Sequence, residues 1–492
     1  MSRGMKSTKR NFLSNVTTWF FKYRDEICVL LPLVLVALAS GIYVHYPVSI
    51  TNDSAIHSEI VNIIVRQGYP TSWQPYADNG FTYPPLFHYI ASIPVLLGLN
   101  PVDAVRITGI IIWSLLPLCF YLLGSLYGRK TAMVSASLSI LVPFLSNVFI
   151  FGEFPQLLAM ELLVLEMYFL KRGKYVTSGI LAGLGVLCHP FIWIVSLLAY
   201  LYYALPVIAR NVKAAYILVV PAAVALPWIP KYFQILMNVL SGSWQNVVYN
   251  EYQPVFWFWP PETLTTYLFG LNYFTPVIIA LSMFGFLKAK DRFIRLFFAA
   301  TLVFSVYHIP YTQLKIFDTL AIPAVILSSI GITELSMHVK KHDVRYGTAI
   351  PVMFLVAMAC IQAYHFDFAK TAWPNIMISP DKPLYDAAVW LGAYDGEEVK
   401  IYAESAPSWS GALSRKIPLE PEITYLESFS DSYKEQSEAN KMIKERLDAG
   451  EDVTGIVEKY SLKYMLTKQE TRFRKIYEKG GWFVYETAPP SV

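Results

Sequence analysis

The sequence predicts a polytopic α-helical membrane protein with a small soluble α/β domain at its C-terminal end, and three observations carry this prediction. Hydrophobic side chains make up 55% of the 492 residues and charged ones only 15%, which leaves too much apolar surface for a water-soluble globule. About eleven apolar runs have the length, roughly 17 to 25 residues, that a helix needs to cross the hydrocarbon core. Beyond residue 374 the composition becomes that of a soluble domain.

The apolar runs define the membrane region, residues 27–373. The first run follows a basic N-terminal segment, residues 1–26, and lacks a small-residue cleavage site, so we interpret it as a retained signal-anchor helix. The predicted spans lie near residues 27–44, 104–127, 131–150, 154–170, 175–189, 191–207, 214–230, 264–287, 293–309, 314–335 and 347–366.

The positions of Lys and Arg predict the sidedness of the chain. Nearly all of them lie in the N-terminal segment and in alternate connections between spans. Because such residues accumulate in cytoplasmic loops, the N-terminus is expected in the cytoplasm and the C-terminal domain outside the cell membrane. The basic residues in question are Lys6, Lys9, Arg10, Lys22, Arg24, Arg129, Lys130, Lys171, Arg172, Lys174, Arg210, Lys213, Lys288, Lys290, Arg292, Arg295, Lys340, Lys341 and Arg345.

Two of the connections expected outside are long, residues 46–103 and 231–263. The second contains the aromatic and proline-rich stretch 254–261, which is typical of an interfacial aromatic belt. The expected outer domain, residues 374–492, contains strand-like segments at 397–403 and 462–466 and a polar helical segment at 432–449.

Composition also excludes some function classes. The formal net charge of +4 is distributed in short clusters between hydrophobic runs, so the chain does not present the basic face of a nucleic-acid-binding protein. All of the cysteines lie in apolar stretches, and their spacing indicates neither a disulfide framework nor a metal site: Cys28, Cys119, Cys188 and Cys360.

The first outer loop contains the strongest functional pattern. Asp53 follows the first span and is expected to begin a helix, which places His57 one turn later on the same face. The loop then reaches Tyr83-Pro84-Pro85-Leu86-Phe87-His88-Tyr89. A long, proline-rich loop that begins with a carboxylate is typical of a built site. The alternative is that Asp53 only caps its helix.

With these residues in place, the sequence resembles the GT-C superfamily of polytopic glycosyltransferases. The resemblance rests on Asp53, His57, the segment Tyr83–Tyr89 and the segment Asn100–Arg106 that leads into the second span. Further similar features are the acidic turn 152–156 between the third and fourth spans, the entry to a late span at 314–323, and a C-terminal outer domain.

The resemblance implies transfer of a sugar from a polyprenyl-phosphate-linked donor to a lipid, glycan or protein acceptor at the outer face. Such a reaction needs a base for the acceptor hydroxyl and cations for the departing phosphate. Asp53 is our candidate base, and inversion is expected because a base on one face of the sugar and a leaving group on the other imply in-line displacement. The candidate phosphate ligands are Arg66, Lys231 and Lys315, for which snorkelling at the membrane interface is the alternative.

Four further residues complete the expected substrate-binding set: His57, Tyr83, His88 and Glu153. A divalent cation such as Mg²⁺ or Mn²⁺ is compatible with Asp53, His57 and Glu153, with Asp78 as an additional ligand, but their spacing does not require one. Lys315 departs from the resemblance, since an arginine is common at this position of the superfamily and lysine binds phosphate as a point charge.

Three other functions fit parts of the sequence. A single-subunit oligosaccharyltransferase also has a GT-C membrane region, but the outer domain lacks a WWDYG motif and has residues 405–413 at the comparable place. A transporter would explain the many spans, although Glu161 and Glu166 in the fourth span are five residues apart and do not share a helix face. A sugar sensor with a decayed site is the third alternative.

Overall fold

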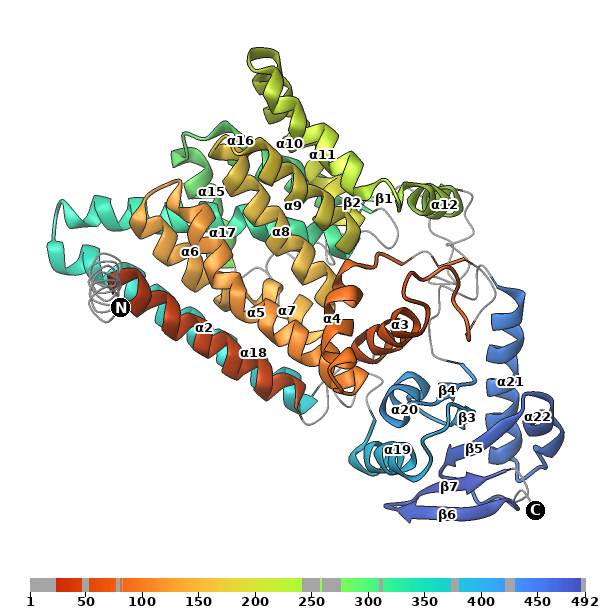
Figure 1. Cartoon of the computed structure of the whole chain (residues 1–492). Helices are drawn as coiled ribbons and strands as arrows, with labels where there is room; N and C mark the ends of the chain where they lie inside the picture. Colours follow the sequence, from red (N-terminus) through yellow and green to blue (C-terminus); the bar gives the residue numbers. More distant parts are fainter. Residues whose placement is uncertain are drawn as a thin grey trace, which may run out of the picture.

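The computed structural model describes residues 24–46, 53–76, 80–81, 83–240, 257–258, 276–308, 313–372, 380–420 and 430–487. Helices dominate these residues, and a small sheet lies near the C-terminal end (Figure 1). The helices before residue 373 are α2 (Arg24–His45), α3 (Asp53–Gln67), α4 (Leu86–Leu96), α5 (Pro101–Ser125), α6 (Arg129–Leu141), α7 (Pro143–Ile150), α8 (Phe154–Lys171), α9 (Tyr175–Cys188), α10 (Pro190–Arg210), α11 (Tyr216–Ala225), α12 (Ile229–Leu240), α15 (Pro276–Lys288), α16 (Arg292–Val306), α17 (Gln313–Lys340) and α18 (Val344–Ala372).

Where the predicted apolar runs lie in the described residues, they fall almost entirely on helices, whereas residues 264–275 of the eighth run lie outside the described residues. Among the described residues, four helices are long and apolar enough to cross a membrane, namely α2, α5, residues 318–340 of α17, and most of α18. The bent pair α6 and α7 adds a fifth candidate. The expected number of about eleven spans stays a prediction, since helices such as α9 are shorter than a crossing usually requires.

The break between α6 and α7 has a local cause. Pro143 occupies the first position of α7, and the two helices meet at an angle of 47°. A proline lacks the amide hydrogen that would continue α6, so the chain turns at Val142. The turn brings Phe149 of α7 against Trp113 of α5, with their rings stacked 4.8 Å apart.

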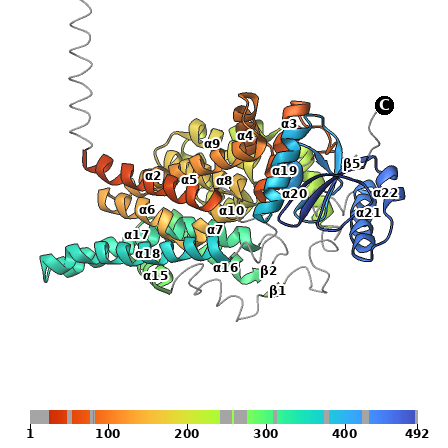
Figure 2. The same ribbon diagram turned by 90° about the horizontal axis from the view of Figure 1, so that it is seen from below.

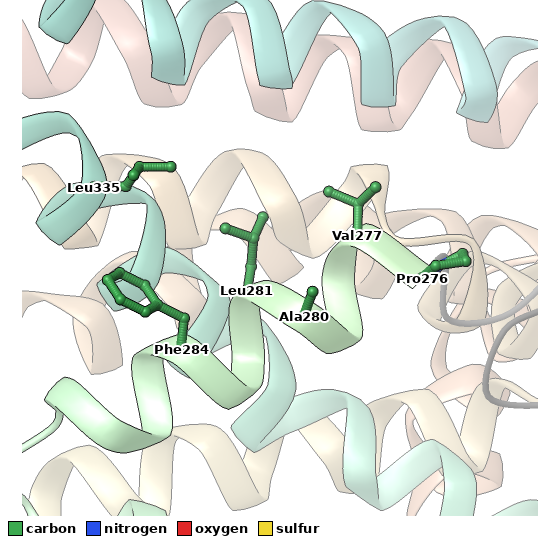
Figure 3. Close-up of a pocket in the computed structure, with 6 residues that line it drawn as sticks. All are labelled: Pro276, Val277, Ala280, Leu281, Phe284 and Leu335. Atoms are coloured by element: carbon green, nitrogen blue, oxygen red, sulfur yellow. The ribbon is translucent and has the colours of Figure 1, made fainter. Parts of the chain in front are cut away.

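Helices α15 and α17 pack with their backbones unusually close together. Ser282 on α15 and Ser328 on α17 lie with their hydroxyl oxygens 2.8 Å apart, and Gly285 and Gly331 leave room for the approach. An apolar groove of about 470 Å³ lies beside this pair (Figure 3). It is lined by Pro276, Val277, Ala280, Leu281, Phe284 and Leu335.

The C-terminal region contains a five-stranded sheet in the order β4-β3-β5-β7-β6. Strand β3 pairs in parallel with β4 and β5, whereas β7 pairs antiparallel with both β5 and β6. The elements are α19 (Lys382–Tyr394), β3 (Lys400–Ala403), α20 (Pro407–Ser414), β4 (Ile417–Pro418), α21 (Asp431–Asp448), α22 (Thr454–Lys459), β5 (Leu462–Thr467), β6 (Arg474–Lys479) and β7 (Trp482–Glu486). The two predicted strands and the predicted polar helix are therefore present as β3, β5 and α21.

Alternate side chains of the strands face opposite layers of helices, as the period of a strand requires. Ile401 and Ala403 of β3 pack with α19 and α20 in one apolar cluster. Tyr402, between them, packs with α21 and α22 in another. The sheet thus forms the middle of an α/β/α arrangement.

This α/β unit lies at the same end of the helical bundle as α3 (Figures 1 and 2). Ala55 of α3 and Val102 of α5 belong to the apolar cluster that also contains Trp409 of α20. Helices α3 and α5 and the C-terminal region are therefore packed together.

Candidate active site

Helix α3 carries the candidate site. It begins at Asp53, so the carboxylate lies in the first turn, where the exposed backbone amides of a helix favour negative charge. Asp53 is half-buried, and His57, one turn later, is 4% exposed. Because residues four apart share a helix face, Asp53 and His57 lie on the same side of α3.

A pair of buried histidines joins α3 to α4. Nε2 of His88 lies 3.1 Å from Nδ1 of His57, and Nδ1 of His88 lies 3.2 Å from the carbonyl oxygen of Pro84. Burial, with a smaller contribution from His57, lowers the pKa of His88 well below the usual 6.5. His88 is therefore a neutral imidazole at physiological pH.

Aromatic rings enclose the histidine pair. The ring centroids of Tyr83 and Phe87 each lie 5.9 Å from that of His57, and Tyr83 lies 5.2 Å from His88. Phe87 in turn lies 6.0 Å from Phe154, the first residue of α8. The half-buried Glu153 directly precedes Phe154, so the predicted site residues of the first loop and the acidic turn lie in one neighbourhood.

A second face of α3 is turned toward the C-terminal region. Ala55 packs in the apolar cluster of α19 and α20, and Arg66 forms an ion pair with Glu398. Glu59 lies between them, and its carboxylate is so close to Gly411 of α20 that a methyl group on this glycine would meet Oε1 of Glu59 at 2.8 Å. Glu59 lies four positions after Ala55 and seven before Arg66, and this spacing places the three residues on one face of α3.

Glu59 is a buried carboxyl group that the sequence analysis did not single out. The hydroxyl of Tyr76 donates a hydrogen bond to Oε2 of Glu59, and both residues are fully buried. Burial raises the pKa of Glu59 to about 7, although the bond from Tyr76 and the charge of Arg66 oppose this rise. Only the three-dimensional contact with α20 distinguishes Glu59 from an ordinary acid of an amphipathic helix.

The structure places the predicted phosphate ligands in different surroundings. Arg66 is engaged by Glu398, as described above. The ammonium group of Lys231 donates to the carbonyl of Pro70 at 3.1 Å and lies 4.1 Å from the ring centroid of Trp228. Lys315 belongs to the first turn of α17, but its side chain lies outside the described residues, as does Asp78.

Two further cations, Arg106 and Lys370, were not among the predicted phosphate ligands. Arg106, 1% exposed in α5, lies with its guanidinium carbon 5.1 Å from the ring centroid of Trp409. One of its guanidinium nitrogens lies 3.7 Å from a carboxylate oxygen of Asp103. Lys370 of α18 donates to the carbonyls of Val44 and Tyr46 at 3.1 and 3.0 Å. Their location inside or directly after apolar runs was the available signal.

The residues proposed for a divalent cation do not converge. Among the described residues, no three His, Cys, Asp or Glu side chains lie close enough together to hold a metal ion. Asp53, His57 and Glu153 therefore do not form a metal centre in the geometry seen here, and we derive no step of the reaction through a cation.

No protein-family model matches the chain, and no curated protein matches it in sequence. Solved structures do match it in fold. The archaeal oligosaccharyltransferase AglB from Archaeoglobus fulgidus, in complex with an inhibitory peptide and a dolichol-phosphate, is 15% identical with a TM-score of 0.52. This match covers 91% of the present chain and 70% of AglB.

ArnT from Cupriavidus metallidurans, bound to undecaprenyl phosphate, is 13% identical with a TM-score of 0.56. The match covers 84% of the present chain and 88% of ArnT. Both are membrane glycosyltransferases of the GT-C superfamily. At these identities the likeness establishes the fold: the chain has the GT-C fold, which confirms the resemblance drawn from its first outer loop.

Proposed function

We propose that this GT-C-fold protein is an inverting glycosyltransferase, which moves a sugar from a polyprenyl-phosphate-linked donor to an acceptor at the outer membrane face. One observation supports the proposal most. A carboxylate, Asp53, begins the helix that links the membrane bundle to the C-terminal region, and the buried pair His57 and His88 lies next to it. The related structures of AglB and ArnT contain dolichol-phosphate and undecaprenyl phosphate, respectively, which supports a lipid-linked donor here.

In the proposed reaction one bond to the sugar forms while another breaks, and Asp53 takes up the proton that is released. Asp53 takes the proton of the acceptor hydroxyl, while the hydroxyl oxygen forms a bond to the anomeric carbon of the sugar. The bond between that carbon and the phosphate oxygen breaks, and the electron pair leaves with the phosphate. Attack from the side opposite the leaving group inverts the anomeric centre.

Cations stabilise the negative charge that develops on the phosphate. Lys315 is our first candidate, because α17 begins near it and a lysine offers a compact point charge. Arg66 and Lys231 are the others. They contact Glu398 and Trp228, respectively, and we propose that this end of the bundle faces outward and meets the lipid head group.

An oligosaccharyltransferase is the second candidate function, and the likeness to AglB favours it. The segment at the comparable place to the acceptor motif forms α20 here. Its Trp409 is fully buried against Arg106, which argues against a role in holding an acceptor peptide. We therefore prefer a lipid or glycan acceptor and keep a peptide as an arm of the test.

The test is transfer of radiolabelled sugar from a panel of polyprenyl-phosphate sugars by the purified protein in lipid nanodiscs. Asp53→Asn is expected to lower the rate by about 10²- to 10⁴-fold, the usual contribution of a general base. The matched control is Glu438→Gln, which makes the same change of charge on the exposed surface of α21 and is expected to keep the full rate.

The other outcomes separate the alternatives. An unchanged rate in a folded Asp53→Asn variant would keep the enzyme class and refute the site. Transfer to a sequon peptide alone would favour the oligosaccharyltransferase. Uptake of a sugar into proteoliposomes without transfer from any donor would favour a transporter and overturn the proposal.

A further inference from the structure

Helix α12 carries a stripe of exposed apolar side chains. Ile229, Phe233 and Met237 are 43%, 62% and 48% exposed, and each lies four residues after the one before. Residues at this spacing share one face of a helix, so the three side chains form a continuous stripe. An exposed apolar stripe indicates contact with a second apolar surface.

The opposite face of α12 is anchored to the protein. The ammonium group of Lys231 donates to the carbonyl oxygen of Pro70 at 3.1 Å, and the hydroxyl of Tyr232 donates to the carbonyl oxygen of Val186 in α9 at 2.8 Å. Directly before α12, Trp228 is buried in an apolar cluster with residues of α3. With about 3.6 residues per turn, Lys231 points to the side of the helix opposite the stripe. Helix α12 therefore has one face held by the protein and one face open.

The stripe continues a larger apolar surface on the preceding residues. Leu226, whose carbonyl accepts a hydrogen bond from the amide of Ile229 one turn later, is 64% exposed. Val219 of α11, two turns before Leu226, is 60% exposed. Both belong to the apolar run 214–230, which is predicted to cross the membrane. The surface that the stripe extends is thus one that is expected to meet lipid.

The anchored face bears side chains that are typical of a membrane interface. The ammonium group of Lys231 lies 4.1 Å from the ring centroid of Trp228 and 5.2 Å from that of Tyr69, whose ring is exposed. Tryptophan and tyrosine accumulate where a membrane meets water, and a lysine there keeps its ammonium group in the polar layer. Trp228 shares its apolar cluster with Tyr433 of α21, so α12 lies at the end of the bundle where the C-terminal region packs (Figure 1).

We propose that α12 lies in the surface layer of the membrane, in the leaflet nearest to the C-terminal region, with Ile229, Phe233 and Met237 among the lipid acyl chains. Its opposite face holds the loop after α3 at this surface through the bond from Lys231 to Pro70. The partner is a lipid surface, bound by apolar contact. The inference goes beyond the proposed function and does not rest on it, because contact with lipid is measured without sugar transfer.

The first test reads the surroundings of the stripe. The full chain, with its four cysteines replaced by alanine, receives Phe233→Cys or Met237→Cys, a bimane label and a nanodisc. Lipids with a nitroxide near the head group are expected to quench both labels severalfold more than they quench a label at Glu438→Cys on exposed α21. Aqueous iodide is expected to show the reverse order. Val352→Cys on α18, a helix apolar enough to cross a membrane, provides the reference for a side chain in lipid.

Two results of the labelling would overturn the proposal. Quenching at Phe233→Cys and Met237→Cys by iodide alone, at the level of Glu438→Cys, would mean that the stripe faces water. Protection from both quenchers would mean that protein covers the stripe, as in contact with a second copy of the chain.

The second test addresses the link to the loop after α3. Within this loop the amide of Phe81 donates to the carbonyl of Thr71 at 3.0 Å. Phe233→Glu places a charge in the lipid and is expected to raise hydrogen exchange at this amide severalfold, whereas Phe233→Leu, the matched control, is expected to leave it unchanged. Lys231→Met keeps an apolar stem and removes the donor. It is expected to raise the same exchange while a label at Met237→Cys stays in lipid.

Unchanged exchange in both Phe233→Glu and Lys231→Met would overturn the link between α12 and the loop. If Phe233→Glu fails to fold, the labelled variants, which add no charge to the stripe, and Lys231→Met still decide. Absence of sugar transfer by the unmodified protein would overturn the proposed function and leave the quenching result as it stands.

Discussion

Helix α3 has two faces that bear acids in opposite environments. On one face Asp53 is half-buried at the first turn and shares its side with His57. On the other face Glu59 is fully buried, accepts a hydrogen bond from Tyr76 and lies against Gly411 of α20. Six positions thus separate a carboxylate that can meet a substrate from one that is sealed inside the protein.

The comparison of the two faces of α3 indicates how the candidate site is held in place. The half-exposed face carries the proposed chemistry, whereas the sealed face joins α3 to the C-terminal region through apolar, hydrogen-bonded and ionic contacts. Because α3 is a single helix, any shift at the sealed face also moves Asp53 and His57. We therefore infer that the C-terminal region positions the candidate site through its contacts with the sealed face of α3, and substitutions at this face test the inference.

The largest effect is expected at Trp409. Its ring is fully buried beside the guanidinium group of Arg106, so Trp409→Ala removes a large core side chain and a cation–π contact. We expect a loss of about 3 to 5 kcal/mol in stability, as for other buried aromatic residues. Thermal unfolding and limited proteolysis between the bundle and the C-terminal region measure it.

The matched control for this substitution is Trp390→Ala. Trp390 is half-buried on α19 and stacks on Tyr477 of the same domain, at 4.6 Å between ring centroids. It should lower stability less and leave sugar transfer intact. The contacts of Glu59 with Gly411 and of Arg106 with Trp409 form a seam between the bundle and α20. Comparable losses of transfer in Trp409→Ala and Trp390→Ala would show that this seam has no special influence on α3.

The next effect concerns the dependence of stability on pH. Burial raises the pKa of Glu59 from its usual 4.5 to about 7, so the folded protein binds a proton that the unfolded chain releases. The contribution of Glu59 is fully present below pH 4.5 and is lost as the pH rises to about 7. At about 1.4 kcal/mol for each pH unit, the loss amounts to about 3 kcal/mol.

Glu59→Gln preserves an acceptor for Tyr76 and removes the titration. The unfolding free energy of the unmodified protein minus that of Glu59→Gln should therefore fall by about 3 kcal/mol as the pH rises from 4.5 to 7. Pulse proteolysis in nanodiscs at several pH values measures the difference. Glu438→Gln, at an exposed acid of α21, should show no such trend. A difference that stays flat for Glu59→Gln as well would mean that the carboxyl group is ionised in the folded protein.

Local patterns in the sequence predicted one face of α3 and missed the other. The start of α3 at Asp53 and the location of His57 follow from short-range rules, and His88 was assigned to the site because it belongs to the same loop. The seam at Glu59 joins residues more than three hundred positions apart, Glu59 with Gly411 and Arg106 with Trp409. No periodicity encodes such a pairing.

The fold shows the same division between local and long-range information. In the part of the chain that the structure describes, hydropathy located helices along the apolar runs, because backbone groups in lipid must be satisfied within the segment. It could not tell a complete span from a shorter helix such as α9, whose end at His189 depends on the following Pro190 and on packing. The same limit applies to Pro143, which divides one apolar run into α6 and α7.

The smallest expected effect is at the rim of the seam, where Arg66 forms its ion pair with Glu398. Both side chains are partly exposed, with 30% and 43% of their surfaces open to solvent, so water screens their attraction. A double-mutant cycle with Arg66→Gln and Glu398→Gln is expected to give a coupling of about 0.2 to 1 kcal/mol, which weakens as salt is added. A salt-independent coupling of several kcal/mol would mean that the pair is sealed like Glu59. In that case Arg66 would be committed to the seam, and Lys315 and Lys231 would be the cations left to contact the phosphate.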